Sequence, residues 1–310
     1  MGRFLVIGCG SIGSRHAENL QKLGQEVWLF DRDQAKLEKL SKKLNIGAYE
    51  FKSKHFPFSG WIVATPPQYH IPFANEAIGH DSHIFIEKPL SDTLVGVDKM
   101  IESAEEKGLI VQVGYQLRFH TGLRHVKRLL DEGRIGKLLS MQFEFGQYLP
   151  YWHPYEDYRN GYTAKTGITL DASHEIDMAL WLCGALPIEI LCQSGKLSNL
   201  EIQSEDTANI LLRFDSHLCN IHLDMVNRVY TRTCKLIGTG ATLMWDANRS
   251  TLLVVSQGKQ EWIDYKPNDP HLDEMAGFIK CIEYGEKPLV TATEAKEVLW
   301  IALKAKGGIL

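Results

Sequence analysis

The sequence lacks the marks of several protein classes. No stretch approaches the roughly 20 consecutive apolar residues of a membrane span, and the start of the chain shows no signal-peptide pattern. The six cysteines form no Cys-x-x-Cys pair and no Cys/His ligand spacing, so neither a metal site nor a disulfide framework is expected. We therefore expect a soluble, cytoplasmic protein that binds no metal and keeps its thiols reduced and buried.

Strong charge of either sign is also missing. The formal net charge is -4, and no run of lysines or arginines is interleaved with aromatic residues, so nucleic acid is not an expected partner. What is present is an ordinary globular composition, 44% hydrophobic and 23% charged, over 310 residues. That length predicts two domains with real cores and ample chain to bury a ligand.

The first part of the chain has the pattern of parallel β-α-β units, in which short apolar runs alternate with amphipathic segments. The expected strands are 3–7, 26–31, 61–64, 83–86 and 109–114. The expected helices are 11–23, 33–44, 69–79 and 94–107. Apolar residues in these helices recur every three or four positions, so each can cover the sheet with one face. We predict a doubly wound Rossmann domain over residues 1–119.

The remainder, 120–310, is predicted to form an α/β domain around a large, mostly antiparallel open sheet. After a helix at 123–132, the strand-like runs are longer and fewer helices separate them. The expected strands are 137–145, 188–192, 206–214, 218–225, 233–238, 251–255 and 261–265. Two terminal helices are expected at 272–284 and 292–305. Such a sheet can offer one face to the first domain.

A glycine-rich fingerprint, Gly8-Cys9-Gly10-Ser11-Ile12-Gly13, follows the first expected strand and opens a helix. Gly8 permits a tight turn, Gly10 lets the backbone approach a pyrophosphate, and Gly13 allows close packing of helix on sheet. The first amides of the helix, at Ser11 and Ile12, offer unpaired N–H groups to an anion. This context predicts that the domain binds a dinucleotide.

Acidic and rigid residues at the ends of later strands extend the predicted cofactor site. Asp31 is placed to accept hydrogen bonds from the adenosine ribose and to repel a 2′-phosphate, which favours NAD over NADP; alternatively, it caps the next helix. Arg32 could stack on adenine or hold a phosphate, which leaves NADP open. Thr65-Pro66-Pro67 must form an extended turn, either a wall of the cofactor site or a rigid loop.

Taken together, these motifs resemble the Gfo/Idh/MocA oxidoreductase family. The resemblance rests on the glycine fingerprint, on Ala64-Thr65-Pro66-Pro67 with His70, and on Glu87-Lys88-Pro89. It continues through 113–120, 133–137 and 174–177. It implies a Rossmann domain followed by an α/β domain with a large sheet, and NAD(P)-dependent oxidation or reduction of sugars, cyclitols or their derivatives. It also implies dimers or tetramers formed through that sheet, and adds His70 and Glu87 to the cofactor site.

Lys88 and His174 are the candidates for the chemistry that the resemblance implies. Oxidation of a secondary alcohol needs a group that takes the hydroxyl proton while hydride leaves the same carbon. Lys88 could donate to the substrate oxygen and His174 could exchange its proton, with Asp171 as its partner or as a substrate ligand. Many members space this Asp and His by four residues, whereas here the spacing is three, so Asp177 is an alternative partner and Asp171 a possible helix cap.

Substrate contacts are expected from an aromatic segment, 148–159, that precedes the predicted helix 171–182. Its aromatic and polar residues resemble those of carbohydrate sites, and a buried apolar loop is the competing interpretation. The candidate substrate residues, besides Lys88, Asp171 and His174, are Arg118, Tyr151, Trp152, Arg159 and Tyr162. Two other functions remain open: a cofactor recycled within one turnover for elimination or glycoside cleavage, and a non-catalytic dinucleotide and sugar sensor.

Overall fold

The computed structural model describes residues 1–50, 57–152, 158–159, 162 and 166–307. The chain divides into two compact units. The N-terminal unit comprises Met1–Gln116 together with Asp269–Lys296, and the C-terminal unit begins at Leu117, runs to Asn268 and resumes at Glu297. The sequence predicts a single boundary after residue 119, with all of 120–310 in the second domain. The structure differs, because a late segment returns to the N-terminal unit.

A six-stranded parallel sheet, in the order β3-β2-β1-β4-β5-β6, forms the centre of the N-terminal unit. Its strands are β1 (Arg3–Ile7), β2 (Glu26–Phe30), β3 (Gly47–Ala48), β4 (Gly60–Val63), β5 (His83–Ile86) and β6 (Val111–Val113). The middle strands are buried on both faces, as expected of a sheet covered by helices on both sides. This confirms the predicted doubly wound domain. The two-residue strand β3 was not predicted.

Helices of the N-terminal unit begin where the sequence supplies a turn or a cap. The helices are α1 (Ser11–Lys22), α2 (Gln34–Leu44), η1 (Pro67–Tyr69), α3 (His70–Gly79), α4 (Val97–Glu106) and α10 (Pro270–Tyr284). Asp33 caps α2 by accepting hydrogen bonds from the amides of Ala35 and Lys36. Asp269 caps α10 in the same way, and a proline follows it at the first helical position.

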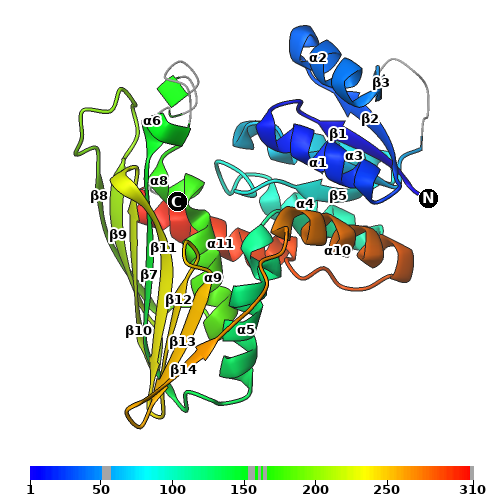
Figure 1. Ribbon diagram of the computed structural model, residues 1–310. Helices are drawn as coiled ribbons and strands as arrows, with labels where there is room; N and C mark the ends of the chain where they lie inside the picture. The colour runs from blue at the N-terminus through cyan, green and yellow to red at the C-terminus, as the bar shows by residue number, and fades with distance from the viewer. Residues whose placement is uncertain (51–56, 153–157, 160–161, 163–165, 308–310) are drawn as a thin grey trace. The chain divides into compact units, whose positions relative to one another are not determined.

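Helix α10 belongs to the core of the N-terminal unit although nearly 160 residues separate it from β6. The ring of Phe278 lies 6.4 Å from that of Phe4 and 5.8 Å from that of Phe85, centroid to centroid. In Figure 1 the orange α10 lies beside the blue α1, which it contacts. The cofactor helix α1 is therefore held partly by residues from the end of the chain.

An eight-stranded sheet, in the order β14-β13-β12-β11-β7-β10-β9-β8, forms the C-terminal unit. Its strands are β7 (Leu138–Tyr148), β8 (Glu189–Gly195), β9 (Thr207–Arg213), β10 (Leu218–Asp224), β11 (Val226–Gly238), β12 (Thr242–Asp246), β13 (Thr251–Ser256) and β14 (Lys259–Ile263). Only the β10–β7 pair is parallel. The mostly antiparallel sheet is confirmed; β12 was not predicted.

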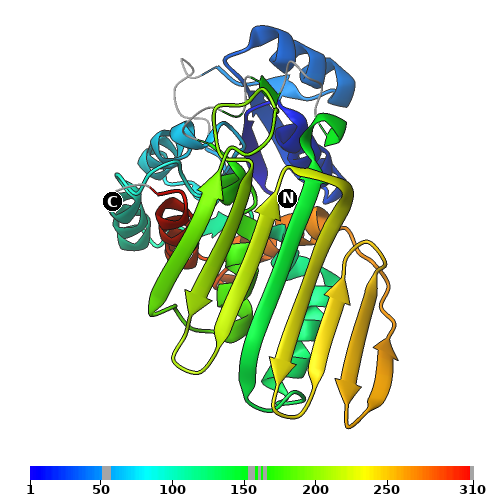
Figure 2. The ribbon, with the colours of Figure 1, turned by 90° about the vertical axis from the view of Figure 1, so that its left-hand side faces the viewer.

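Helices α5 (Thr121–Asp131), α8 (Ile168–Asp171) and α9 (Ser173–Cys183) cover one face of this sheet (Figure 2). The 3-10 turn η2 (Gln116–Phe119) precedes α5, the short α6 (Leu149–Trp152) follows β7, and α11 (Ala292–Ala305) is the last helix of the described chain. Helices α9 and α5 pack on β7, β10, β12 and β13. The strands alternate in burial; for example, Ala208, Ile210 and Leu212 of β9 are buried and the residues between them are not. No described helix lies on the opposite face.

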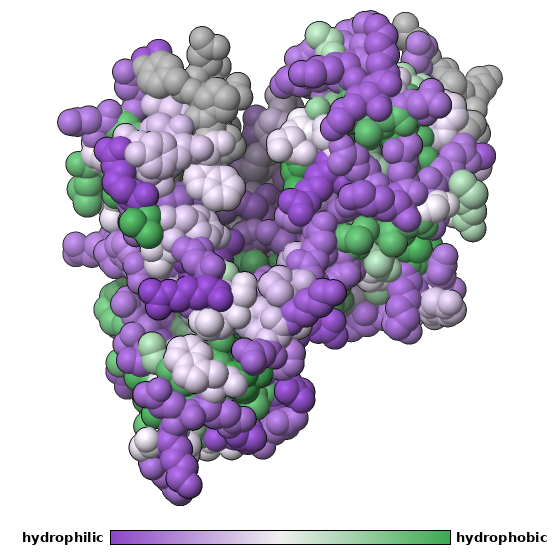
Figure 3. All heavy atoms as spheres, viewed as in Figure 1, coloured by the Kyte–Doolittle hydropathy of each residue, from purple (hydrophilic) through white to green (hydrophobic). Residues whose placement is uncertain are grey.

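Hydrophilic residues make up most of the surface seen in Figure 3, although several green apolar residues are exposed among them. Within the described residues, no helix is long and apolar enough to cross a membrane. The described part of the chain likewise holds no cluster of three or more His, Cys, Asp or Glu side chains that could bind a metal ion.

Candidate functional site

The β1–α1 turn is built so that two of its glycines cannot be replaced. Gly8 has a φ of +99°, and a Cβ there would lie 2.4 Å from the carbonyl oxygen of Ala64. A Cβ on Gly13 would lie 1.8 Å from the carbonyl oxygen of Gly8. These contacts make a turn that is tight enough to bring α1 directly against the sheet, which is the packing that the fingerprint predicts.

Gly10, unlike Gly8 and Gly13, has open space at its Cβ position. A Cβ there would meet no described atom of the chain within 4 Å, and Gly10 caps α1 without a side-chain hydrogen bond. The first turn of α1 carries no acidic residue, so its N–H groups, among them those of Ser11 and Ile12, present positive potential to the space beside Gly10. An open approach to a helix N-terminus fits the pyrophosphate of a dinucleotide.

Asp31 holds the glycine turn and the start of α2 together. Its Oδ2 accepts a hydrogen bond of 2.7 Å from the amide of Cys9, and its Oδ1 one of 2.8 Å from the amide of Asp33. The cap of α2 is Asp33, so the alternative role of Asp31 as cap does not apply. Each oxygen of Asp31 keeps a second lone pair that can accept from a ribose hydroxyl. Burial, helped by the Asp31 carboxylate, raises the pKa of the Cys9 thiol to about 12.

Arg32 and Tyr69 form a small stacked platform beside Asp31. The guanidinium carbon of Arg32 lies 5.1 Å from the centroid of the Tyr69 ring, and the ring is partly exposed. The two residues come from the ends of β2 and η1. This arrangement leaves Arg32 available to stack on an adenine and does not separate NAD from NADP by itself.

His70 ties together the two loops that flank it. Its Nδ1 lies 2.9 Å from the carbonyl oxygen of Pro89, and its Nε2 lies 2.7 Å from that of Thr65. The side chain is fully buried, and burial lowers the pKa of His70 against the opposing pull of the two carbonyls. His70 thus positions the Thr65-Pro66 loop and the Lys88-Pro89 segment, and its predicted contact with the cofactor stays a prediction.

Lys88 follows β5, and its neighbour Glu87 is buried. Oε1 of Glu87 lies 2.6 Å from Nε2 of His16, and Oε2 accepts the amide of Lys88 at 3.1 Å. Burial favours the protonated form of Glu87, but the hydrogen bond from His16 and the nearby positive charge outweigh it and hold the pKa of Glu87 below its usual value. Both carboxylate oxygens of Glu87 therefore face the protein interior rather than an open cofactor site.

The predicted cofactor residues meet at one edge of the parallel sheet. Strands β2, β1, β4 and β5 are neighbours, and their carboxyl ends lead to Asp31, the glycine turn, Thr65 and Lys88 respectively. Because parallel strands end at the same edge, these residues line one side of the N-terminal unit. This is where ligands bind in open α/β sheets.

His174 lies in the first turn of α9, in the C-terminal unit, with only 4% of its surface exposed. The predicted helix over 171–182 was wrong in one respect, because Ala172 has a ψ of 29° and separates α8 from α9. Asp171 ends the first helix and His174 begins the second. Helical spacing therefore does not relate their side chains.

Tyr162 supports Asp171. Its hydroxyl donates a hydrogen bond of 2.6 Å to Oδ2 of Asp171, and its ring is buried. Burial, with the charge of Asp171 beside it, raises the pKa of Tyr162 well above its usual value, so the hydroxyl stays a donor. Tyr162 was predicted to bind substrate; the structure shows it holding a candidate catalytic carboxylate.

Arg118 and Asp177 form a buried ion pair. Nε of Arg118 lies 3.1 Å from each carboxylate oxygen of Asp177, and Nη2 lies 2.7 Å from Oδ1. Both side chains are almost fully buried. The pair connects η2 to α9. It favours a structural role for Asp177 over orientation of His174, and it places Arg118 in the interior, away from its predicted role in binding substrate.

The aromatic segment that was predicted to meet substrate lies only partly within the described residues; 153–157 and 160–161 lie outside them. Tyr151 and Trp152, in α6, are 71% and 56% exposed. The ring centroids of Tyr151 and Tyr148 lie 4.7 Å apart, and those of Trp152 and Tyr230 lie 5.7 Å apart. Arg159 forms an ion pair with Glu201 at the surface.

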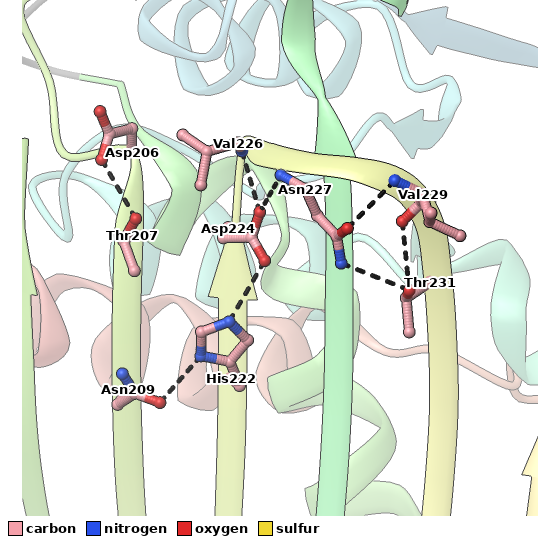
Figure 4. Close-up of polar contacts among 9 residues, drawn as sticks. All are labelled: Asp206, Thr207, Asn209, His222, Asp224, Val226, Asn227, Val229 and Thr231. Atoms are coloured by element: carbon pink, nitrogen blue, oxygen red, sulfur yellow. Dashed lines mark hydrogen bonds and ion pairs between the residues drawn. The ribbon is translucent and has the colours of Figure 1, made fainter. Parts of the chain in front are cut away.

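The turn from β10 into β11 precedes Arg228 and Tyr230, which contact the aromatic residues Tyr148 and Trp152. No sequence prediction covered this turn. Oδ1 of Asp224 accepts the amides of Val226 at 2.9 Å and Asn227 at 2.6 Å (Figure 4). Oδ2 lies 3.2 Å from Nε2 of His222, whose Nδ1 lies 2.9 Å from Oδ1 of Asn209. His222 is thus the middle of a polar chain across two strands.

Arg228 lies in the first part of β11, just after this turn. Its guanidinium carbon lies 3.4 Å from the centroid of the Tyr148 ring, a close cation–π contact. The sequence signal that could have found it is the motif Asp224-x-x-Asn227-Arg228, in which an aspartate precedes a turn that carries an exposed arginine and Tyr230.

Comparisons with known proteins identify the fold and the family. The NAD-binding Rossmann model of the Gfo/Idh/MocA oxidoreductases matches residues 2–115, and the C-terminal domain model of the same family matches 123–244. A myo-inositol 2-dehydrogenase of Thermotoga maritima is 27% identical, with 98% of this chain and 95% of that protein covered. A scyllo-inositol 2-dehydrogenase (NAD(+)) of Bacillus subtilis is 26% identical, with 98% and 92% covered.

A solved structure agrees with these matches. The crystal structure of a probable dehydrogenase from Thermotoga maritima superposes with a TM-score of 0.83 at 26% identity, over 98% of this chain and 96% of that one. The two family models together cover most of the chain, and the glycine turn that they predict has the geometry described above. The chain belongs to the Gfo/Idh/MocA family and is an oxidoreductase with an NAD-binding Rossmann unit.

Proposed function

We propose that the protein is an NAD-dependent dehydrogenase that interconverts a secondary alcohol and a ketone on a cyclitol, a sugar or a sugar derivative. The observation that carries this proposal is the sheet edge of the N-terminal unit, where the open helix N-terminus at Gly10, the Asp31 carboxylate and Lys88 lie at the ends of neighbouring strands. The family match and the two inositol dehydrogenases support the choice of substrate class.

The residues divide the reaction between them. The glycine turn and Asp31 would hold NAD+, which would supply the acceptor for the hydride of the carbinol carbon as the hydroxyl loses its proton and becomes a carbonyl. His174 takes that proton in oxidation and returns it in reduction. The ammonium of Lys88 stabilises the negative charge that develops on the reacting oxygen. Asp171, held by Tyr162, assists His174 or binds a neighbouring hydroxyl.

Binding of the ring is assigned to exposed groups of the C-terminal unit. Tyr151 and Trp152 present flat apolar faces on which the C–H face of a sugar or cyclitol can pack, and Arg159 offers a surface cation. Arg118 is not included, because its guanidinium is buried against Asp177.

A substrate panel tests the function. Inositols, free sugars, acidic sugars and nucleotide-linked sugars are incubated with saturating NAD+, and NADH is followed by its absorbance. With the substrate found, we expect Lys88→Ala and His174→Ala each to lower kcat by about 10²- to 10⁴-fold, because each removes a group that acts in proton transfer or charge stabilisation. Lys99→Ala, at an exposed lysine of α4, is the matched control and should keep wild-type turnover.

Other outcomes assign other functions. Conversion of a sugar without net NADH would indicate a cofactor that is recycled within one turnover. Tight dinucleotide binding with no hydride exchange, for any compound that raises Tm, would indicate a sensor. Wild-type turnover in both the Lys88 and His174 variants would refute the assignment of these residues.

A further inference from the structure

A buried hydrogen bond joins the helix that carries the glycine fingerprint to the residue before the candidate catalytic lysine. His16 is in α1, one turn beyond the start of the helix, and its side chain is fully buried. Its Nε2 lies 2.6 Å from Oε1 of Glu87, which directly precedes Lys88 in sequence. Such a short contact between a ring nitrogen and a carboxylate is typical of a charge-assisted hydrogen bond.

The geometry leaves Glu87 little freedom. Its Oε2 accepts the amide of Lys88 at 3.1 Å, so one carboxylate joins the His16 ring to the backbone of the lysine. On another side lies Gly114, where a Cβ would come within 3.1 Å of Oε1. A glycine at this position leaves just enough room for the carboxylate. The His16 ring, the Lys88 amide and the space left by Gly114 thus together fix the position of the Glu87 carboxylate.

Packing alone does not account for His16. The ring contacts those of Phe85 and His271 edge-on, at centroid distances of 5.1 and 6.2 Å, which a phenylalanine could also do. Its Nδ1 has no hydrogen-bond partner among the described residues. The polar contact that the structure shows for this ring is the one to Glu87. The hydrogen bond to Glu87 is therefore the reason that a polar imidazole, rather than an apolar ring, is buried here.

We propose that His16 is a positioning residue for the hydride-transfer reaction: it fixes the Glu87 carboxylate, whose second oxygen fixes the Lys88 amide, and so it sets where α1 and the catalytic lysine stand relative to each other. The inference rests on the proposed role of Lys88. The hydrogen bond between His16 and Glu87 joins the helix that receives the cofactor to the residue that acts on the substrate, within a single structural unit.

Two substitutions at His16 separate positioning from packing. His16→Gln keeps an N–H donor near the place of Nε2, whereas His16→Phe keeps the ring and removes the donor. Glu87→Gln is a second route, because the amide carries no charge and keeps only one acceptor oxygen, so the charge-assisted contact with His16 is lost. Each variant is assayed with the substrate identified above for kcat, for KM and for the Kd of NAD+, and each Tm is measured.

We expect His16→Phe and Glu87→Gln each to lower kcat by about ten- to a hundredfold, because a small displacement of the lysine is costly. KM for the substrate should change by less than about threefold, since the loss falls on the transition state. His16→Gln should restore most of kcat. The double variant His16→Phe with Glu87→Gln should lose no more than either single one, because both break the same link.

Asn19→Ala is the matched control for damage to α1. Asn19 is buried one turn further along the helix, and its Nδ2 has no hydrogen-bond partner among the described residues. This variant should lower Tm without lowering the kcat of the folded protein. If His16→Phe behaves in the same way, with Tm reduced and kcat retained, His16 is structural and the proposal is wrong.

A measurement without turnover keeps this proposal separate from the proposed function. Hydrogen–deuterium exchange of residues 84–90, followed by mass spectrometry, should be faster in His16→Phe and close to wild type in His16→Gln. Unchanged exchange in His16→Phe would overturn the link. Restored protection in His16→Gln, together with full activity of Lys88→Ala, would uphold the link and refute only the task given to the lysine.

Discussion

At the scale of single residues, the glycine turn separates what folding demands from what a ligand demands. Gly13 is required by the protein itself, because its Cβ position falls on the Gly8 carbonyl oxygen. Gly10 is required by nothing in the described chain, since its backbone is extended and its Cβ would be surrounded by open space. Two glycines three positions apart are therefore needed for different reasons, and a sequence pattern cannot tell the two reasons apart.

This difference predicts opposite phenotypes for two identical substitutions. Gly13→Ala should destabilise the protein by about 3 kcal/mol or more, because helix and turn must move apart. Gly10→Ala should leave Tm near the wild-type value and weaken NAD+ binding at least tenfold, since the methyl group occupies the approach to the helix N-terminus. Thermal unfolding and a fluorescence titration with NADH measure the two effects. Equal losses of Tm in both variants would contradict this account.

Local motifs explain why the glycine turn was predictable. The fingerprint and Asp31 act through backbone geometry that is set within a few residues of each site, so their spacing in sequence carries the information. The pairing of His16 with Glu87, 71 residues apart, depends on tertiary contact and leaves no such trace. The same is true of the contact of Tyr162 with Asp171 and of the pair between Arg118 and Asp177.

At the scale of secondary-structure elements, helix α9 shows how a single residue can limit a prediction. Ala172 is an excellent helix former, and nothing in the sequence around it signals an end. The structure nevertheless interrupts the helix there, at a backbone conformation with ψ of 29°. The missed strand β12 has a similar explanation, because its five residues follow a glycine-containing turn and pair only with the strands beside it.

The ion pair between Arg118 and Asp177 anchors α9 from within. Asp177→Ala should destabilise the C-terminal unit by about 3 to 5 kcal/mol, because it leaves a buried guanidinium without its carboxylate. The exposed pair Lys127–Asp131 of α5 is the control, and Asp131→Ala should cost no more than about 0.5 kcal/mol. Urea unfolding followed by circular dichroism measures the difference. Equal costs in the two variants would show that burial does not matter at this pair.

At the scale of the whole molecule, the open face of the C-terminal sheet presents one continuous row of outward residues. The register aligns Leu191, Leu211, Asn220, Gln142, Lys235, Met244, Leu253 and Trp262 across all eight strands. Apolar side chains occupy both ends of the row and polar ones its centre. Large apolar side chains on an uncovered sheet face are typical of an interface.

We propose that this face binds a second copy of the chain, as the family resemblance implied. Leu211→Glu, which places charges on the face, should shift the protein toward the monomer in light scattering coupled to size-exclusion chromatography. Val95→Glu is the control, because Val95 is a highly exposed apolar residue of the other unit. A wild-type protein that is monomeric at all concentrations tested would refute the proposal.

The route of the chain through its two units has a consequence for biosynthesis. The N-terminal unit takes Met275, Phe278 and Ile279 of α10 into the same core as Phe4 and Phe85. These residues leave the ribosome only after the entire eight-stranded sheet has been translated. The cofactor-binding unit therefore cannot finish folding when its own first 116 residues have emerged, and must hold an incomplete apolar face while the second unit is made.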